Sequence, residues 1–135
     1  MRLYSFTNMY LSPLQCGLQT AHLVSCLYSN HYTFDDDYFV RWAKDNTIII
    51  LNGGNSQKLR ELITLFENIG NTYPWASFSE DQQSLDGALT CVGILLPEKI
   101  YTAAYQLRTN PMVDIQLSDW EVTLIDTIDT FSLRN

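Results

Sequence analysis

The sequence predicts a single α/β domain in which helices pack on a mixed four-stranded sheet. The chain has 135 residues, of which 46% are hydrophobic, and this suits one compact domain with a buried core. Apolar, β-branched runs of strand length alternate with segments that carry helix start and stop signals. No repeat, low-complexity tract or long linker divides the chain. The expected element order is therefore β-α-α-β-α-β-β-α-α.

The first strand and the first helix are expected before residue 31. Residues 2–7, RLYSFT, form a short buried strand. Ser12 followed by Pro13 is a strong helix start, because serine caps the first turn and proline fits the first helical position. One helix face should pack on the sheet and consists of Leu14, Leu18, Ala21, Ser25 and Tyr28. A second, polar face consists of Gln15, Gln19, His22 and Cys26.

The middle of the chain adds two helices and the clearest strand. The acidic segment 35–45, DDDYFVRWAKD, suits a short helix, since its Asp residues stand at the positive N-terminus. Residues 46–52, NTIIILN, are a β-branched apolar run typical of a strand. Residues 52–55, NGGN, end that strand as a turn, with a phosphate nest as the alternative. Residues 56–70 form a helix with Ser56 as its N-cap.

Two strands and two helices complete the predicted order. Residues 73–80 and 88–97 form strands joined by a polar loop. A helix opens at Pro97, and a capping box from Ser118 to Glu121 opens the last, amphipathic helix. Ligands in such folds bind at the carboxyl ends of strands. We therefore expect a pocket where the first strand, the second strand and the third strand end.

Charge and cysteine content exclude several classes of function. The net charge is −7, and the chain contains no Lys or Arg stripe, which counts against binding of extended nucleic acid. Cys16, Cys26 and Cys91 are scattered without a Cys-x-x-Cys or Cys/His cluster, so neither a metal site, a cofactor nor a disulfide is expected. No apolar run has transmembrane length and no signal peptide is evident, which predicts a cytoplasmic protein without a membrane partner.

The first helix is unusual because it lacks charge. Residues 11–34 contain no Lys, Arg, Asp or Glu, although a solvated helix normally carries them. This surface is expected to meet a pocket or a neighbouring subunit, and a homodimer is predicted. The apolar side of the last helix, with Trp120 and Phe131, either closes the core or docks on a second subunit.

Several motifs resemble type 2 peptidyl-tRNA hydrolases and their short phage-borne relatives. RLYSF…LSPLQCGLQTAHL and WASFSEDQQSLDGALTCVGILLP occur in the family's order and spacing. The family's A-A-Q-x-x-H-A helix core is matched by residues 17–23, and its acidic loop before a threonine-led strand is matched by residues 80–90. The resemblance covers residues 2–97, so residues 1–97 are interpreted as a hydrolase-like core. Residues 98–135 are a helical C-terminal extension, packed on the core or on a dimer partner.

The resemblance implies a pocket at the exit of the first strand. Together with the aromatic residues that could stack on a base, its ligand-binding residues would be Asn8, Tyr10, Gln15, Gln19, His22, Trp75, Glu80, Asp81 and Thr90. In an enzyme, His22, Asp81 and Thr90 would be catalytic, with a water positioned against an ester.

Each of these residues also has a structural interpretation. His22 suits a helix–sheet contact, Gln19 suits a backbone cap, and Thr90 is a good strand former.

Three departures from the family pattern count against catalysis. Asn8 and Tyr10 stand where the family has Arg and Asp, and Gln15 stands where it has Lys. A neutral amide stabilises an oxyanion less than an ammonium does, at a cost of about 3 kcal/mol, or roughly 100-fold in rate.

Three functions remain open. The favoured one is a non-catalytic protein that binds a small polar or nucleotide-like ligand, for example a phage protein that sequesters a nucleotide-derived defence signal in the host cytoplasm. The alternative is a peptidyl-tRNA hydrolase with a rearranged catalytic set, and the third is a protein-interaction module.

Overall fold

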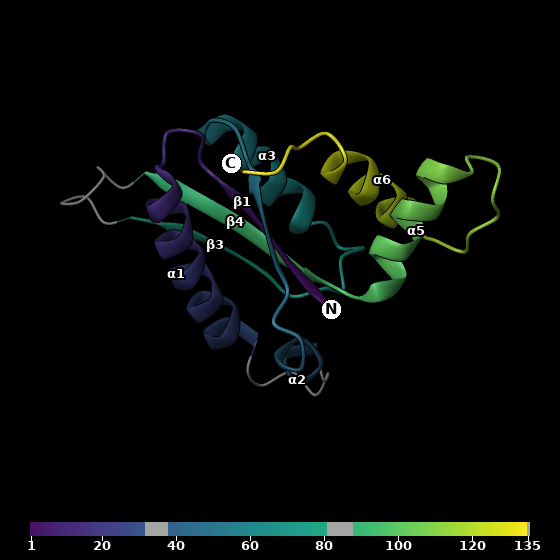
Figure 1. The fold of residues 1–135 in the computed structure, drawn as a ribbon, viewed down its shortest axis with the longest axis horizontal. Coiled ribbons are helices and arrows are strands. Elements are labelled where there is room, and N and C mark those ends of the chain that lie inside the picture. Colours follow the sequence, from purple (N-terminus) through teal and green to yellow (C-terminus); the bar gives the residue numbers. More distant parts are fainter. Residues whose placement is uncertain (32–37, 81–87, 135) are drawn as a thin grey trace.

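The strands and helices follow the predicted order. A computed structural model describes residues 1–31, 38–80 and 88–134, and Figure 1 shows its elements. The strands are β1 (Arg2–Thr7), β2 (Ile48–Asn52), β3 (Trp75–Ser79) and β4 (Leu89–Leu96). The helices are α1 (Pro13–His31), α2 (Tyr38–Ala43), α3 (Ser56–Phe66), α5 (Glu98–Thr109) and α6 (Asp119–Ile128). The predicted fold class, a single α/β domain, is confirmed.

The four strands form one mixed sheet in the order β2-β1-β4-β3. β1 pairs in parallel with β2 and antiparallel with β4, and β4 pairs antiparallel with β3. The first strand in the chain is therefore an inner strand of the sheet. The carboxyl ends of β1, β2 and β3 share one edge with the amino end of β4.

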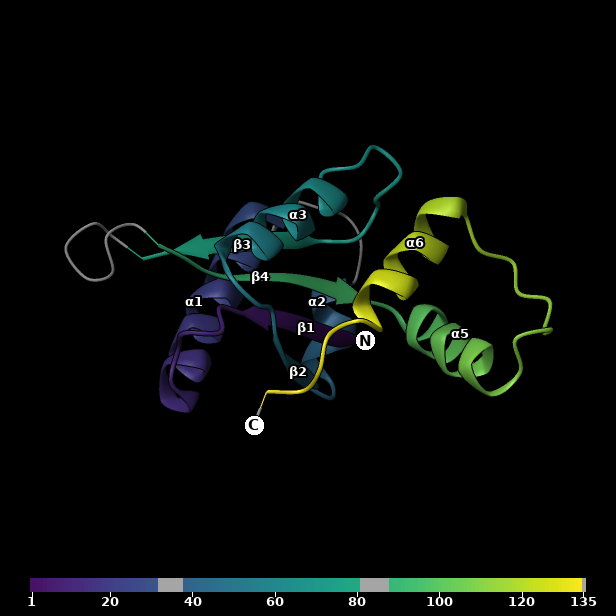
Figure 2. The same ribbon diagram turned by 90° about the horizontal axis from the view of Figure 1, so that it is seen from above.

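Helices cover both faces of the sheet, and side chains that alternate along β1 and β4 fill two cores. On one face Leu3 and Leu95 pack with Leu23 and Leu27 of α1. The opposite, larger core lies under α3, α5 and α6, and it includes Tyr4, Phe6, Val92, Ile94, Phe66, Trp120 and Leu124. α5 and α6 lie side by side at the end of the sheet where β4 ends (Figures 1 and 2). The apolar side of α6 thus closes the core of its own chain.

α1 packs on the sheet with a different face from the predicted one. Its buried residues are Cys16, Gln19, Thr20, Leu23 and Leu27, whereas the predicted apolar face is exposed, so that prediction was wrong.

The reason lies in β1, which presents the small polar side chains Ser5 and Thr7 to this helix. Ser5 Oγ lies 2.8 Å from Thr20 Oγ1, and Cys16 Sγ donates to Thr7 Oγ1 at 3.4 Å. Because the buried polar groups of this sheet surface need hydrogen-bond partners, the helix face that packs on it is partly polar.

Gly93 lets α1 approach β4 closely. A Cβ atom at this position would lie 2.4 Å from Leu23 Cδ2 and 2.9 Å from the carbonyl oxygen of Tyr4. Real Cβ atoms essentially never come within 3.0 Å of another heavy atom in this way, so the absence of a side chain is a packing requirement here.

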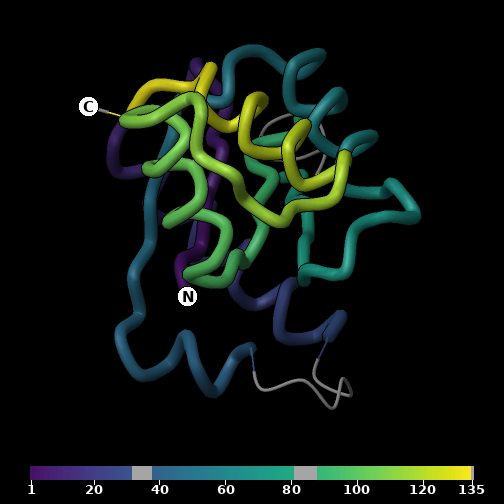
Figure 3. Tube along the Cα trace, turned by 90° about the vertical axis from the view of Figure 1, so that its right-hand side faces the viewer, coloured from purple at the N-terminus to yellow at the C-terminus, as the bar shows by residue number. Residues whose placement is uncertain are grey.

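The segment after α6 returns to the sheet and to the β1–α1 loop. The backbone of residues 132–134 pairs with that of residues 50–52, and this pairing covers the edge of β2. The Arg134 guanidinium donates hydrogen bonds to the carbonyl oxygens of Met9 and Leu11. Figure 3 shows this segment beside the loop that follows β1. The segment after α6 therefore holds the loop that leads into α1.

Candidate functional site

The β1–α1 loop enters the helix through a capping box. Ser12 Oγ accepts a hydrogen bond from the backbone N–H of Gln15 at 3.2 Å, and Gln15 Oε1 accepts one from the backbone N–H of Ser12 at 2.9 Å. The helix start predicted from Ser12 and Pro13 is confirmed. The oxygen of the Gln15 amide is thus engaged by the helix start.

Asn8 fixes the exit of β1 to two other elements. Its side chain is buried, and Nδ2 donates to the carbonyl oxygen of Leu89 at 3.1 Å and to Ser56 Oγ at 3.4 Å. Its Oδ1 accepts from the backbone N–H of Tyr10 at 3.1 Å. One amide therefore joins the end of β1, the start of β4 and the start of α3.

Ser56 belongs to this site, although the sequence predicted it only as a helix cap. Asn55 is the N-cap instead, because its side chain accepts from the backbone N–H of Lys58 at 3.0 Å. Ser56 is the first residue of α3 and its hydroxyl meets Asn8. Asn and Ser are both good caps, so the pattern offered no basis for choosing between neighbours. The predicted end of this helix was also wrong, since α3 stops at Phe66.

The two glycines before α3 serve a turn. The N–H of Gly53 donates to the carbonyl oxygen of Thr7 at 2.7 Å, and the N–H of Gly54 donates to Asn52 Oδ1 at 3.1 Å. Gly54 has a φ of +78°, a conformation that favours glycine. Both glycine amides are engaged within the protein, which favours the turn over the phosphate nest.

Gln19 links an acid to a hydroxyl beside the same edge. Its Nε2 donates to Glu80 Oε2 at 2.9 Å, and its Oε1 accepts from Thr90 Oγ1 at 2.9 Å. Because an ionised carboxylate only accepts hydrogen bonds, the NH₂ group must face Glu80 and the oxygen must face Thr90. The Thr90 hydroxyl also lies 3.0 Å from the carbonyl oxygen of Phe78.

A β-bulge directs Thr90 toward α1. Phe78 pairs with Cys91 and Ser79 pairs with Leu89, so Thr90 is an extra residue on β4. Cys91 Sγ also contacts Gln19, donating to its carbonyl oxygen at 3.3 Å. Burial raises the pKa of Cys91 to about 12, so this thiol stays neutral near pH 7 and acts as a hydrogen-bond donor.

These groups border a pocket of about 280 Å³. The pocket is lined by Asn8, Tyr10, Leu11, Gln15, Ser56, Ala88, Leu89 and Thr90. In the described part of the chain its lining is entirely uncharged, with amides and hydroxyls set among aliphatic side chains. Tyr10 stands at the rim, with 81% of its surface exposed. The described lining residues can donate and accept hydrogen bonds, and none of them carries a charge.

Four of the predicted ligand-binding residues, Asn8, Tyr10, Gln15 and Thr90, are thus brought together, and Gln19 and Glu80 adjoin them through Thr90. His22 and Trp75 do not line the pocket. His22 is exposed, and its ring stacks on Phe78 with centroids 4.7 Å apart. Trp75 starts β3, where its carbonyl oxygen accepts from His31 Nε2 at 3.0 Å. Asp81 lies outside the described residues.

Residues 1–31, 38–80 and 88–134 contain neither a metal-binding cluster nor a membrane-spanning helix. No three His, Cys, Asp or Glu side chains gather there in a way that could hold a metal ion. No helix in those ranges is both long and apolar enough to cross a membrane.

Neither a family model nor a curated protein matches the chain. The resemblance to type 2 peptidyl-tRNA hydrolases therefore remains a prediction from short motifs. The functional conclusion depends on the pocket itself.

Proposed function

We propose that this is a non-catalytic binding protein, which holds a small polar, nucleotide-like ligand in the pocket between the β1–α1 loop, α3 and β4. The observation that carries the proposal is the uncharged lining of the described residues, in which amides and hydroxyls are set among aliphatic side chains. The volume of about 280 Å³ is close to the lower end of the roughly 300–1,000 Å³ range of small-molecule sites. Such a site accommodates one ring system with polar edges.

The chemistry of the lining suits a nucleobase or nucleoside. Base edges present acceptors that the NH₂ group of Gln15 can match, since its amide oxygen is held by the helix start, and Tyr10 at the rim can stack on the ring. Ser56 brings a hydroxyl at the N-terminus of α3, which suits a ribose or phosphate oxygen. The acidic surface argues against a long polyanion such as tRNA.

The same lining supports binding over hydrolysis. Ester hydrolysis needs a base and a group that stabilises the oxyanion. Ser56 accepts a hydrogen bond from Asn8, whose amide cannot take up a proton, and His22 stands outside the pocket. A peptidyl-tRNA hydrolase remains the alternative because Glu80 reaches Thr90 through Gln19.

The resemblance to short phage-borne members of the hydrolase family suggests what such binding would achieve. A protein that sequesters a nucleotide-derived defence signal needs affinity and no turnover, which agrees with a neutral pocket. The host cytoplasm, where that signal would be met, remains a prediction, and so does the third possibility, a protein-interaction module.

The experiment is native mass spectrometry of the protein purified from cells, followed by denaturation and analysis of the released small molecules. We expect a stoichiometric nucleotide-like adduct. A panel of nucleoside monophosphates and cyclic dinucleotides, tested by thermal shift, then identifies the class. At about 100 times Kd the ligand should stabilise the fold by roughly 2.7 kcal/mol.

Tyr10→Ala should weaken that binding about tenfold through lost stacking. The matched control is Tyr105→Ala, which removes an exposed tyrosine from α5 and should bind like the wild type. An empty protein that no member of the panel stabilises contradicts the proposal. Cleavage of N-acetylated aminoacyl-tRNA would establish the hydrolase instead.

A further inference from the structure

We propose that the exposed side of α1 forms a homodimer, in which α1 packs antiparallel on α1 of a second copy. The contact surface, here called the α1 seam, consists of Leu14, Leu18, Ala21, Ser25 and Tyr28. The proposal is independent of what the pocket binds.

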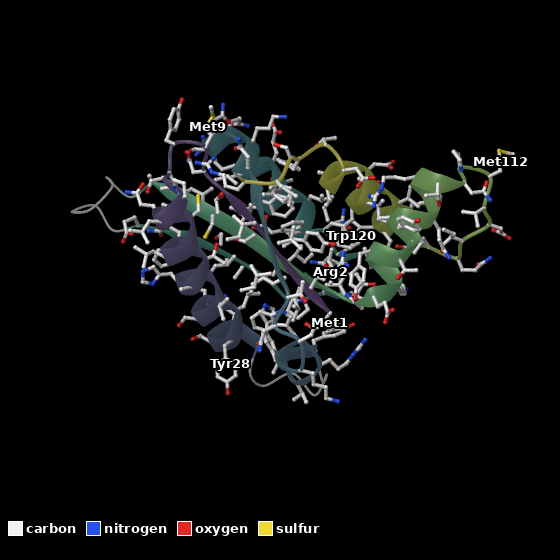
Figure 4. The ribbon with its side chains drawn as sticks, in the orientation of Figure 1. Met1, Arg2, Met9, Tyr28, Met112 and Trp120 are labelled. Atoms are coloured by element: carbon white, nitrogen blue, oxygen red, sulfur yellow. The ribbon has the colours of Figure 1, made fainter. Side chains whose placement is uncertain are left out.

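The α1 seam is apolar and open to solvent. Leu14 is 75% exposed, Leu18 is 53% exposed and Tyr28 is 62% exposed. Figure 4 shows Tyr28 pointing away from the sheet near the C-terminal end of α1, where its ring makes an edge contact with Phe39 of α2 and the rest is exposed. A surface helix normally presents charged side chains to water, but α1 contains no Asp, Glu, Lys or Arg in its 19 residues. An apolar, uncharged surface of this kind marks an interaction site.

The spacing of the seam suits a second helix. Its members follow one another at intervals of four, three, four and three residues, which is the repeat of a coiled-coil seam. This repeat keeps the side chains on one stripe along α1, a helix about 28 Å long. A partner helix can therefore contact the stripe over its full length, at a crossing angle of about 20°.

The seam is complementary to itself. Its bulky side chains, Leu14 and Tyr28, stand at the two ends, and the small Ala21 is at the centre. Reversing the partner about Ala21 places Leu14 against the partner's Tyr28 at both ends. Gly17 is exposed nearby, with open space where a Cβ would be, so the two helices can approach closely. The antiparallel arrangement also brings helix ends of opposite partial charge together.

Charge points to a second copy as the occupant. A net charge of −7 makes two copies repel wherever acidic surfaces face each other. α1 itself contains no acidic residue, so contact between the two α1 helices brings no like charges together within the described residues of α1. A partner recognised through its charge would find no countercharge on the seam.

Sedimentation velocity over about 1–300 µM protein tests the proposal. We expect the mass to rise from 15.5 kDa toward twice that value. Leu18→Glu, which buries a charge in the interface, should weaken the dimer roughly 100-fold or more. The matched control is Ile69→Glu, at a fully exposed residue after α3, which should dimerise like the wild type. Because screening relieves repulsion, raising NaCl from about 50 to about 500 mM should tighten the dimer.

Cross-linking tests the orientation, in a Cys26→Ser background that removes the half-buried thiol. Mild oxidation should join Ala21→Cys to itself, and should join Leu14→Cys to Tyr28→Cys when the two proteins are mixed. Circular dichroism confirms that each variant is folded. A monomer at every concentration overturns the proposal, as does a dimer that Leu18→Glu leaves intact. A cross-link of Leu14→Cys only to itself overturns the antiparallel arrangement.

Discussion

The hydroxyl of Thr90 lies 2.9 Å from the amide oxygen of Gln19, and this contact joins β4 to α1 beside the pocket. The bulge that places Thr90 there also brings Cys91 to the backbone of Gln19. The pocket edge is therefore held by buried hydrogen bonds that a single substitution can break.

Gln19→Glu should destabilise the fold by about 2–3 kcal/mol near pH 8. The new carboxylate would face Glu80, which accepts from the Gln19 NH₂ group in the wild type. The shared site raises the pKa of the new pair, so stability is retained at low pH and lost as the pH rises through that pKa. Urea unfolding at pH 5 and pH 8 measures the difference.

The matched control for that variant is Gln57→Glu, on the exposed surface of α3. It should show little dependence on pH between the same two conditions. An equally small effect at Gln19 would mean that its amide does not face Glu80.

Gly93→Ala should cost about 1–3 kcal/mol, because the new methyl group would overlap Leu23 and force α1 away from the sheet. Gly17→Ala, measured on protein dilute enough to be monomeric, is the control in the same helix–sheet layer. It meets no atom within 4 Å and replaces a helical glycine, so it should stabilise the fold by up to about 1 kcal/mol. Thermal unfolding compares the two, and a loss of stability at both positions would contradict the packing described.

Glu121→Gln should flatten the acid limb of the stability curve. Burial alone would raise the pKa of Glu121, but hydrogen bonds from Ser118, Tyr73 and Lys99 outweigh it and hold that pKa below its usual value. A lowered pKa means that the stabilisation is present above the unfolded-state pKa and is lost as the pH falls through the folded-state value.

Glutamine keeps the capping box at the start of α6, so only the charge-dependent bonds are lost. We expect a cost of about 1–2 kcal/mol at pH 7 that shrinks toward pH 3. Glu61→Gln on exposed α3 should leave the whole curve unchanged. Guanidinium unfolding across this pH range measures all three proteins, and a constant gap for Glu121→Gln would argue against the charge-dependent bonds.

The three cysteines should differ sharply in reactivity. Cys16 and Cys91 are buried and Cys26 is half-buried, so a maleimide should label Cys26 first in the native protein. All three should react in urea. Peptide mapping identifies the labelled sites, and native labelling of Cys91 would show that α1 opens readily from β4.

The fold was predicted well because the strongest local sequence patterns agree with the contacts that each element makes in the folded domain. Ser12-Pro13 and the β-branched run of β2 are such cases. The face of α1 was predicted wrongly because burial was assigned by hydrophobicity alone. The polar side chains of β1 decide which face is buried, and those contacts depend on the assembled sheet.

Only part of the candidate site could be predicted from the sequence, because the strand ends and the strand register decide which residues meet. Trp75 opens β3, whose other end borders the site, and five strand residues separate those ends by roughly 13 Å. The bulge at Thr90 depends on strand register, which no local pattern encodes. Ser56 lines the pocket from the first turn of α3, because Asn55 and not Ser56 is the N-cap.

The inner position of β1 has a consequence for synthesis. This strand is made first, yet its partner β4 follows it by more than eighty residues, and ribosomes add about 5–20 residues per second. During the several seconds before β4 emerges, β1 can pair only with β2, and its other edge has no partner. Such long-range pairing slows folding. A nascent chain stalled before β4 therefore lacks the strand that joins β1 to β3, so the four-stranded sheet cannot form until β4 has left the ribosome.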